Sequence, residues 1–156
     1  MRVKLVVIVG VLFLIMGCTE EIRFPEGIPD FVKESDFRLI DWEEKAVLFG
    51  DSAFVGNENK SGVIGANMPS LNGQKWMWHL WGVDSLGKLT VVGYHRESQK
   101  VQQILTTDWS TPLGGENNGA DAHAPSSVKI PEKGEWAILL YVDEQLFDIL
   151  VLDIQE

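Results

Sequence analysis

The amino-acid sequence predicts an all-β fold: an immunoglobulin-like Greek-key sandwich of about seven to nine strands, preceded by a signal helix and a tether. Three observations support this prediction. From residue 37 onward, short apolar stretches alternate with turns rich in Gly, Asn, Asp and Pro. The chain closes with two alternating apolar runs around a short turn, which is the pattern of a β-hairpin. After residue 18 no stretch shows the apolar period of a long helix.

The first 17 residues have the pattern of a lipoprotein signal peptide. Arg2 and Lys4 precede an unbroken apolar run over 5–16, which is shorter than the roughly 20 residues that a membrane span needs. The following segment, Leu14-Ile15-Met16-Gly17-Cys18, resembles the bacterial lipobox, in which the chain is cut before a lipid-modified cysteine. The alternatives are an ordinary signal peptide or a buried free cysteine. We expect lipidation of Cys18, which would hold the protein on the extracytoplasmic face of the bacterial cell membrane.

The composition of the mature chain restricts its partners. Removing residues 1–17 leaves 11 basic and 23 acidic residues, a net charge of −12. Such a balance argues against nucleic acid as a partner, because phosphate backbones require a basic face. It also argues against charge-driven docking onto anionic lipids. Cys18 is the single cysteine, so no disulfide can form within the chain and stability must come from the core.

Residues 18–36 are predicted to be a tether and 37–156 the β-sandwich domain. The segment 19–36 is polar, contains Pro25 and Pro29, and follows neither the helical nor the strand period. Four apolar side chains could pin parts of it to the domain: Ile22, Phe24, Ile28 and Phe31.

Within the domain, the stretches 37–40 and 46–49 are apolar, turn residues occupy 50–51 and 57–62, and 62–66 is a plausible strand. Segment 75–81 places Trp76, Trp78 and Leu80 on one face and Met77, His79 and Trp81 on the other. Both faces are large and mostly apolar, which predicts a central strand. Strands at 88–95 and 101–107 follow, and 111–127 is predicted to be a long loop.

The last two apolar runs of the sequence predict β-strands most clearly. Trp136, Ile138, Leu140 and Val142 alternate with Ala137, Leu139 and Tyr141, and 146–154 alternates in the same way after a turn at 143–145. We therefore predict a hairpin with a buried face.

Several motifs together resemble a family of uncharacterised lipoproteins from Bacillus-type bacteria. They are the segments 57–60 (NENK), 77–82 (MWHLWG) and 114–123 (GGENNGADAH), with the Gly134-x-Trp136 start of the closing hairpin. The resemblance runs from about residue 37 to the end. It implies a lipoprotein and a sandwich fold, and it implies no activity.

The long loop carries the candidate binding residues because loops of this length are often functional. They are Trp109, Glu116, Asn117, Asn118, Asp121 and His123. Trp109 is the tryptophan most expected to be exposed. Asp121 and His123 are weak candidates for a metal site, since zinc needs three or four converging ligands and the calcium spacing of an EF-hand is absent. The competing reading is a packed His79, a strand His95 and a solvated or loop-bracing His123.

The favoured function is a non-catalytic binding or accessory domain that contacts an envelope protein or a cell-wall component. No catalytic residue is assigned, because the sequence has no Gly-x-Ser-x-Gly elbow, and no cofactor is expected. Two alternatives stay open: a metal- or small-ligand-sensing lipoprotein, and a cell-wall-active enzyme.

Overall fold

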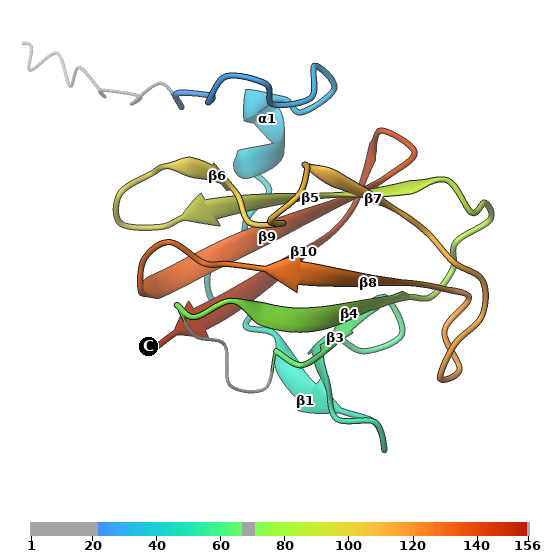
Figure 1. Ribbon diagram of the computed structural model, residues 1–156. Coiled ribbons are helices and arrows are strands. Elements are labelled where there is room, and N and C mark those ends of the chain that lie inside the picture. Colours follow the sequence, from blue (N-terminus) through green and yellow to red (C-terminus); the bar gives the residue numbers. More distant parts are fainter. Residues whose placement is uncertain (1–21, 67–70, 156) are drawn as a thin grey trace, which may run out of the picture.

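The computed structural model describes residues 22–66 and 71–155 (Figure 1). The predicted signal peptide and Cys18 lie outside this part. Among the described residues, no helix is both long enough and apolar enough to cross a membrane. One short helix precedes ten strands, whose bounds are α1 (Glu34–Phe37), β1 (Val47–Phe49), β2 (Phe54–Asn57), β3 (Ser61–Ile64), β4 (Gln74–Leu80), β5 (Lys88–His95), β6 (Val101–Gln103), β7 (Ser110–Pro112), β8 (Ala122–Val128), β9 (Gly134–Val142) and β10 (Gln145–Ile154).

The strands form two antiparallel sheets. The first sheet has the order β1-β2-β3-β4-β8, and the second has the order β10-β9-β5-β6, with β7 also pairing with β5. The chain changes sheet between β4 and β5, between β7 and β8, and again between β8 and β9. The resulting β4–β8 and β5–β9–β10 neighbours match the B–E and C–F–G pairings of immunoglobulin domains. The predicted sandwich is confirmed, and β4 is a central strand as predicted.

The strand count differs from the predicted seven to nine, because the described residues contain ten. The additional strands are short. β1, β2 and β7 have three or four residues each, which is too few to show an alternating pattern.

The predicted loop over 111–127 is wrong in extent. β7 and β8 occupy both of its ends, and only 113–121 joins them. Pro125 concealed β8, because proline is rare inside sheets. β8 accommodates it as the last strand of the first sheet, and among the described residues its other side makes single bridges with Leu105 and Gly114.

The inner core lies between the two sheets. Trp76, Trp78 and Leu80 from β4 meet Trp136, Ile138 and Leu140 from β9, and all six side chains are fully buried. The closing hairpin is confirmed: β9 and β10 pair around Asp143 and Glu144, both of which have positive φ. Two such residues at the centre of a two-residue loop define the type I′ turn favoured by hairpins.

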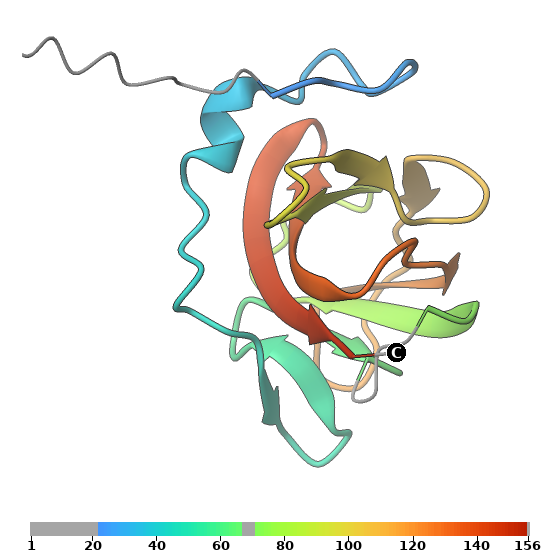
Figure 2. The same ribbon diagram turned by 90° about the vertical axis from the view of Figure 1, so that its left-hand side faces the viewer.

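A second cluster covers the outer face of the second sheet. Strand side chains such as Val92, Leu139 and Val151 pack there against Val32 and Phe37 from the N-terminal segment. In Figure 2 this segment, blue to cyan, runs across the top and down one side of the sandwich, outside β10. The Tyr141 hydroxyl donates to Asp36 Oδ2 at 3.0 Å, and burial together with this carboxylate raises the pKa of Tyr141. β9 is therefore buried on both faces.

The apolar contacts expected between the tether and the domain are present. Ile22, Ile28 and Phe31 are partly buried against this outer cluster. The Phe24 ring lies 5.7 Å from the Phe37 ring. The described part of the predicted tether, 22–36, is thus packed along the domain.

Candidate functional site: a groove between two edge strands

Trp109 does not have the exposure predicted for it. Its side chain is only 7% exposed and belongs to the outer cluster. The Val91 N–H donates to the Trp109 carbonyl at 2.9 Å. Residue 109 therefore runs alongside β5, and its ring lies on the covered face of the second sheet.

The predicted residues 116–118 and Asp121 lie on the loop 113–121, which is braced against the end of β4, and His123 lies in β8. Asn117 and Ala120 exchange two backbone hydrogen bonds around Asn118 and Gly119. The Trp81 indole N–H donates to the Gly119 carbonyl at 2.7 Å.

Two of the predicted polar side chains are held by hydrogen bonds to backbone groups. Asp121 Oδ2 accepts from the Gly82 N–H at 2.6 Å, and His123 Nδ1 lies 2.7 Å from the Gly115 carbonyl oxygen. Glu116 and Asn118 are exposed. These contacts give Asp121 and His123 bracing roles, so the loop-bracing reading of His123 is confirmed.

No metal cluster forms in the part of the chain that the structure describes: no three His, Cys, Asp or Glu side chains converge there. The structure thus brings no third ligand to the weak candidates Asp121 and His123.

His79 holds the loop through a hydrogen-bond contact with Asn117. Its side chain is fully buried, with Nδ1 3.1 Å from the Met77 carbonyl oxygen and Nε2 3.1 Å from Asn117 Oδ1. Its ring packs edge-on to Phe54 at 4.8 Å and parallel to His123 at 6.4 Å. Burial lowers the pKa of His79, and the charge of His123 acts in the same direction. The predicted packed His79 is confirmed.

This environment gives a pH dependence of stability. Because the folded pKa of His79 lies below its unfolded value of 6.5, the unfolded chain binds the proton more readily. The stabilisation by neutral His79 is complete above pH 6.5 and declines as the pH falls from there through the folded pKa. Denaturant unfolding at a series of pH values should show this loss, and His79→Phe should reduce it. An unchanged pH profile in His79→Phe would contradict this origin.

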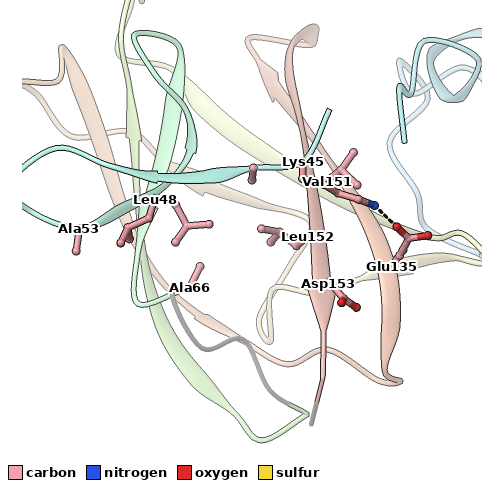
Figure 3. Close-up of a pocket in the computed structure, with 10 residues that line it drawn as sticks. Lys45, Leu48, Ala53, Ala66, Glu135, Val151, Leu152 and Asp153 are labelled. Carbon is pink, nitrogen blue, oxygen red and sulfur yellow. Dashed lines mark hydrogen bonds and ion pairs between the residues drawn. The ribbon is translucent and has the colours of Figure 1, made fainter. Parts of the chain in front are cut away.

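A groove opens where the edges of the two sheets meet, between β1 and β10 (Figure 3). Its volume is about 600 Å³. One wall comes from β1, β2 and the end of β3, and the other from β10. Apolar side chains predominate in the lining: Ala46, Leu48, Ala53, Val55, Ala66, Val151 and Leu152.

Charged side chains stand at one end of this groove. Lys45 forms an ion pair with Glu135, and Arg96 pairs with the other oxygen of the same carboxylate. Hydrogen bonds first from Lys45 and then from Arg96 lower the pKa of Glu135. Asp153 also lies on the rim, and among the described residues no cation pairs with it.

The strand beside the groove is an open edge. β1 is the first strand of its sheet, and Val47 and Leu48 are 57% and 65% exposed. Exposed apolar residues on an unpaired edge strand are uncommon in soluble proteins and typical of interaction sites. Sequence reasoning missed these residues. The available signal was the apolar stretch 46–49, which has no polar alternation and is followed directly by turn residues.

Comparisons with known proteins agree with the fold. The profile of the family Domain of unknown function (DUF4871) matches residues 31–152. Among solved structures, the chain is similar to a candidate lipoprotein from Bacillus anthracis, at a TM-score of 0.65 and 20% identity, covering 82% of this chain and 96% of that chain. At this identity the similarity shows a shared fold. No curated protein is significantly similar in sequence.

Proposed function

We propose that this chain, which belongs to the family Domain of unknown function (DUF4871), is an extracytoplasmic lipoprotein anchored through Cys18, as its lipobox-like segment and its similarity to a candidate lipoprotein suggest. Its non-catalytic sandwich would bind an envelope protein at the groove between β1 and β10. The observation that carries the binding role is the exposure of Val47 and Leu48 on an edge strand beside an apolar groove. Such a combination of apolar core and charged rim is the usual anatomy of a protein interface.

The position of the N-terminal segment supports this proposal. Ile22 is already packed on the domain, and only Thr19–Glu21 separate it from Cys18. Four residue steps span at most ~14 Å, so a lipid on Cys18 would hold the domain close to the bilayer. The β1–β2 hairpin lies at the opposite end of the sandwich from α1 (Figures 1 and 2). An anchored chain would therefore present the groove away from the membrane.

Photo-crosslinking in cells tests the proposal. A photoreactive residue placed at Leu48 of the full chain should capture a defined envelope protein. The matched control is Leu86, which is 58% exposed on the turn before β5. The same adduct from Leu86, or none from Leu48, would contradict a binding role for the groove.

The anchor is tested in the same strain by adding Cys18→Ser. We expect the chain to leave the membrane fraction or to stay unprocessed, and the Leu48 adduct to be lost. A processed chain that stays on the membrane would refute the lipid anchor.

A further inference from the structure

We infer that the occupant of the groove is an extended polypeptide strand with alternating apolar and basic residues, which pairs with the free edges of β1 and β10. This inference rests on the proposed binding function and specifies the chemistry of its partner. It is carried by the backbone geometry at the point where the two sheets separate.

The edges of β1 and β10 begin as neighbours and then part. Lys45 and Val151 form a single parallel bridge, in which the Ala46 N–H donates to the Val151 carbonyl at 2.9 Å. In the described part of the chain, the pairing between the two sheets at this edge ends with that bridge. The groove occupies the space beyond it.

The backbone groups on these two edges face the groove. In an extended strand the N–H and C=O of successive residues point to opposite sides. Because Ala46 N–H faces β10, the N–H and C=O of Leu48, two residues further on, face the same side. By the same reasoning the backbone of Asp153 faces outward from β10, since the Val151 carbonyl does. Each strand thus offers a donor and an acceptor to an incoming strand, as in β-augmentation.

The side chains around these edges indicate what the strand would carry. Leu48 presents exposed apolar surface beside the groove, which is also lined by the largely buried Val55 and Leu152. This lining fits the apolar residues on one face of an alternating strand. On the rim, Glu135 is already shared by two cations, whereas Asp153 has no cation partner among the described residues. The mature chain carries a net charge of −12. A lysine or arginine next to the apolar residue therefore complements Asp153.

Peptide binding to the full chain in phospholipid nanodiscs tests the inference. The probe is the fluorescent peptide acetyl-Lys-Val-Lys-Val-Lys-Val-Lys-amide, and binding is measured by anisotropy. We expect binding that falls at least about tenfold in Leu48→Asp and is unchanged in the matched exposed variant Leu86→Asp. Asp153→Lys should weaken binding about tenfold, and a glutamate-for-lysine peptide should then bind this variant better than it binds the wild type.

N-methylated peptides distinguish backbone strand pairing from non-specific binding through the side chains. Methylation of alternate backbone nitrogens removes the donors of one edge while leaving the side chains in place. Because the strand pairs with both β1 and β10, each of the two methylated series should bind more weakly than the unmethylated peptide, and equal binding of all three peptides overturns the inference.

The remaining outcomes separate this inference from the proposed function. If the peptide fails to bind while the Leu48 adduct forms in cells, the strand inference is overturned and the binding role stands. If the chain alone forms dimers in sedimentation that Leu48→Asp abolishes, the occupant is a second copy and the inference is again overturned.

Discussion

Replacing Trp136 by alanine is expected to lower the free energy of unfolding by about 3–5 kcal/mol. The Trp136 side chain is fully buried in the inner core. Its indole N–H donates to the Glu132 carbonyl at 3.0 Å, and its ring lies 5.0 Å from that of His95. A Cβ added at Gly93 would come within 3.2 Å of the same ring, so Gly93 provides the space it occupies. Alanine would leave a large cavity and remove the donor from a backbone carbonyl.

Denaturant unfolding followed by far-UV circular dichroism measures this loss. Trp136→Phe should lose less than Trp136→Ala, because it retains most of the ring volume. Leu86→Ala, at an exposed position, should be close to neutral. A change below about 1 kcal/mol for Trp136→Ala would show that the ring does not fill the core in solution.

The second large effect is expected for Asp148→Ala, at about 2–4 kcal/mol. Asp148 follows a register shift in β10 and links the two sheets. Its carboxylate accepts from the Asn57 amide at 3.0 and 3.1 Å and from the hydroxyl of fully buried Ser61. Alanine would leave the fully buried Ser61 hydroxyl without this acceptor, which costs more than the bond contributes, whereas the Asn57 amide would keep the Ile149 carbonyl at 3.0 Å.

Asp148→Asn is the matched control for this prediction. It keeps one oxygen acceptor and the side-chain volume, so it should recover part of the lost stability. If Asp148→Asn and Asp148→Ala unfold at the same denaturant concentration as the wild type, the Asp148 contacts do not hold the sheets together.

The parts of the fold that could be predicted are those whose pattern is long and local. The hairpin of β9 and β10 has nine and ten residues per strand, and alternation over that length is unambiguous. β8 was hidden because Pro125 and two serines interrupt its apolar pattern. Trp109 was misjudged because its burial depends on the covered outer face of a sheet, and no neighbouring residue signals that cover.

The groove lay beyond sequence reasoning for a different reason. Leu48 and Val151 come from distant parts of the chain, and they line one groove only because the two sheets meet at this edge. Local periodicity reports which residues form a strand, but it does not report which strand edges remain unpaired. Five of the predicted loop residues, 116–118, Asp121 and His123, are close in sequence and lie close together, whereas Trp109 lies apart on the outer face of the second sheet.

The cover formed by the N-terminal segment has a consequence for how the chain folds. Asp36 meets Tyr141 across 105 residues, and Ala46 meets Val151. Contacts this distant in sequence require closure of a loop of 105 residues, and high contact order slows folding. The N-terminal segment therefore has no complete sheet to cover until β9 and β10 have been synthesised. Until then the apolar side chains of this segment, such as Val32 and Phe37, lack their partners on that sheet, which leaves the unfinished chain most vulnerable to aggregation and proteolysis.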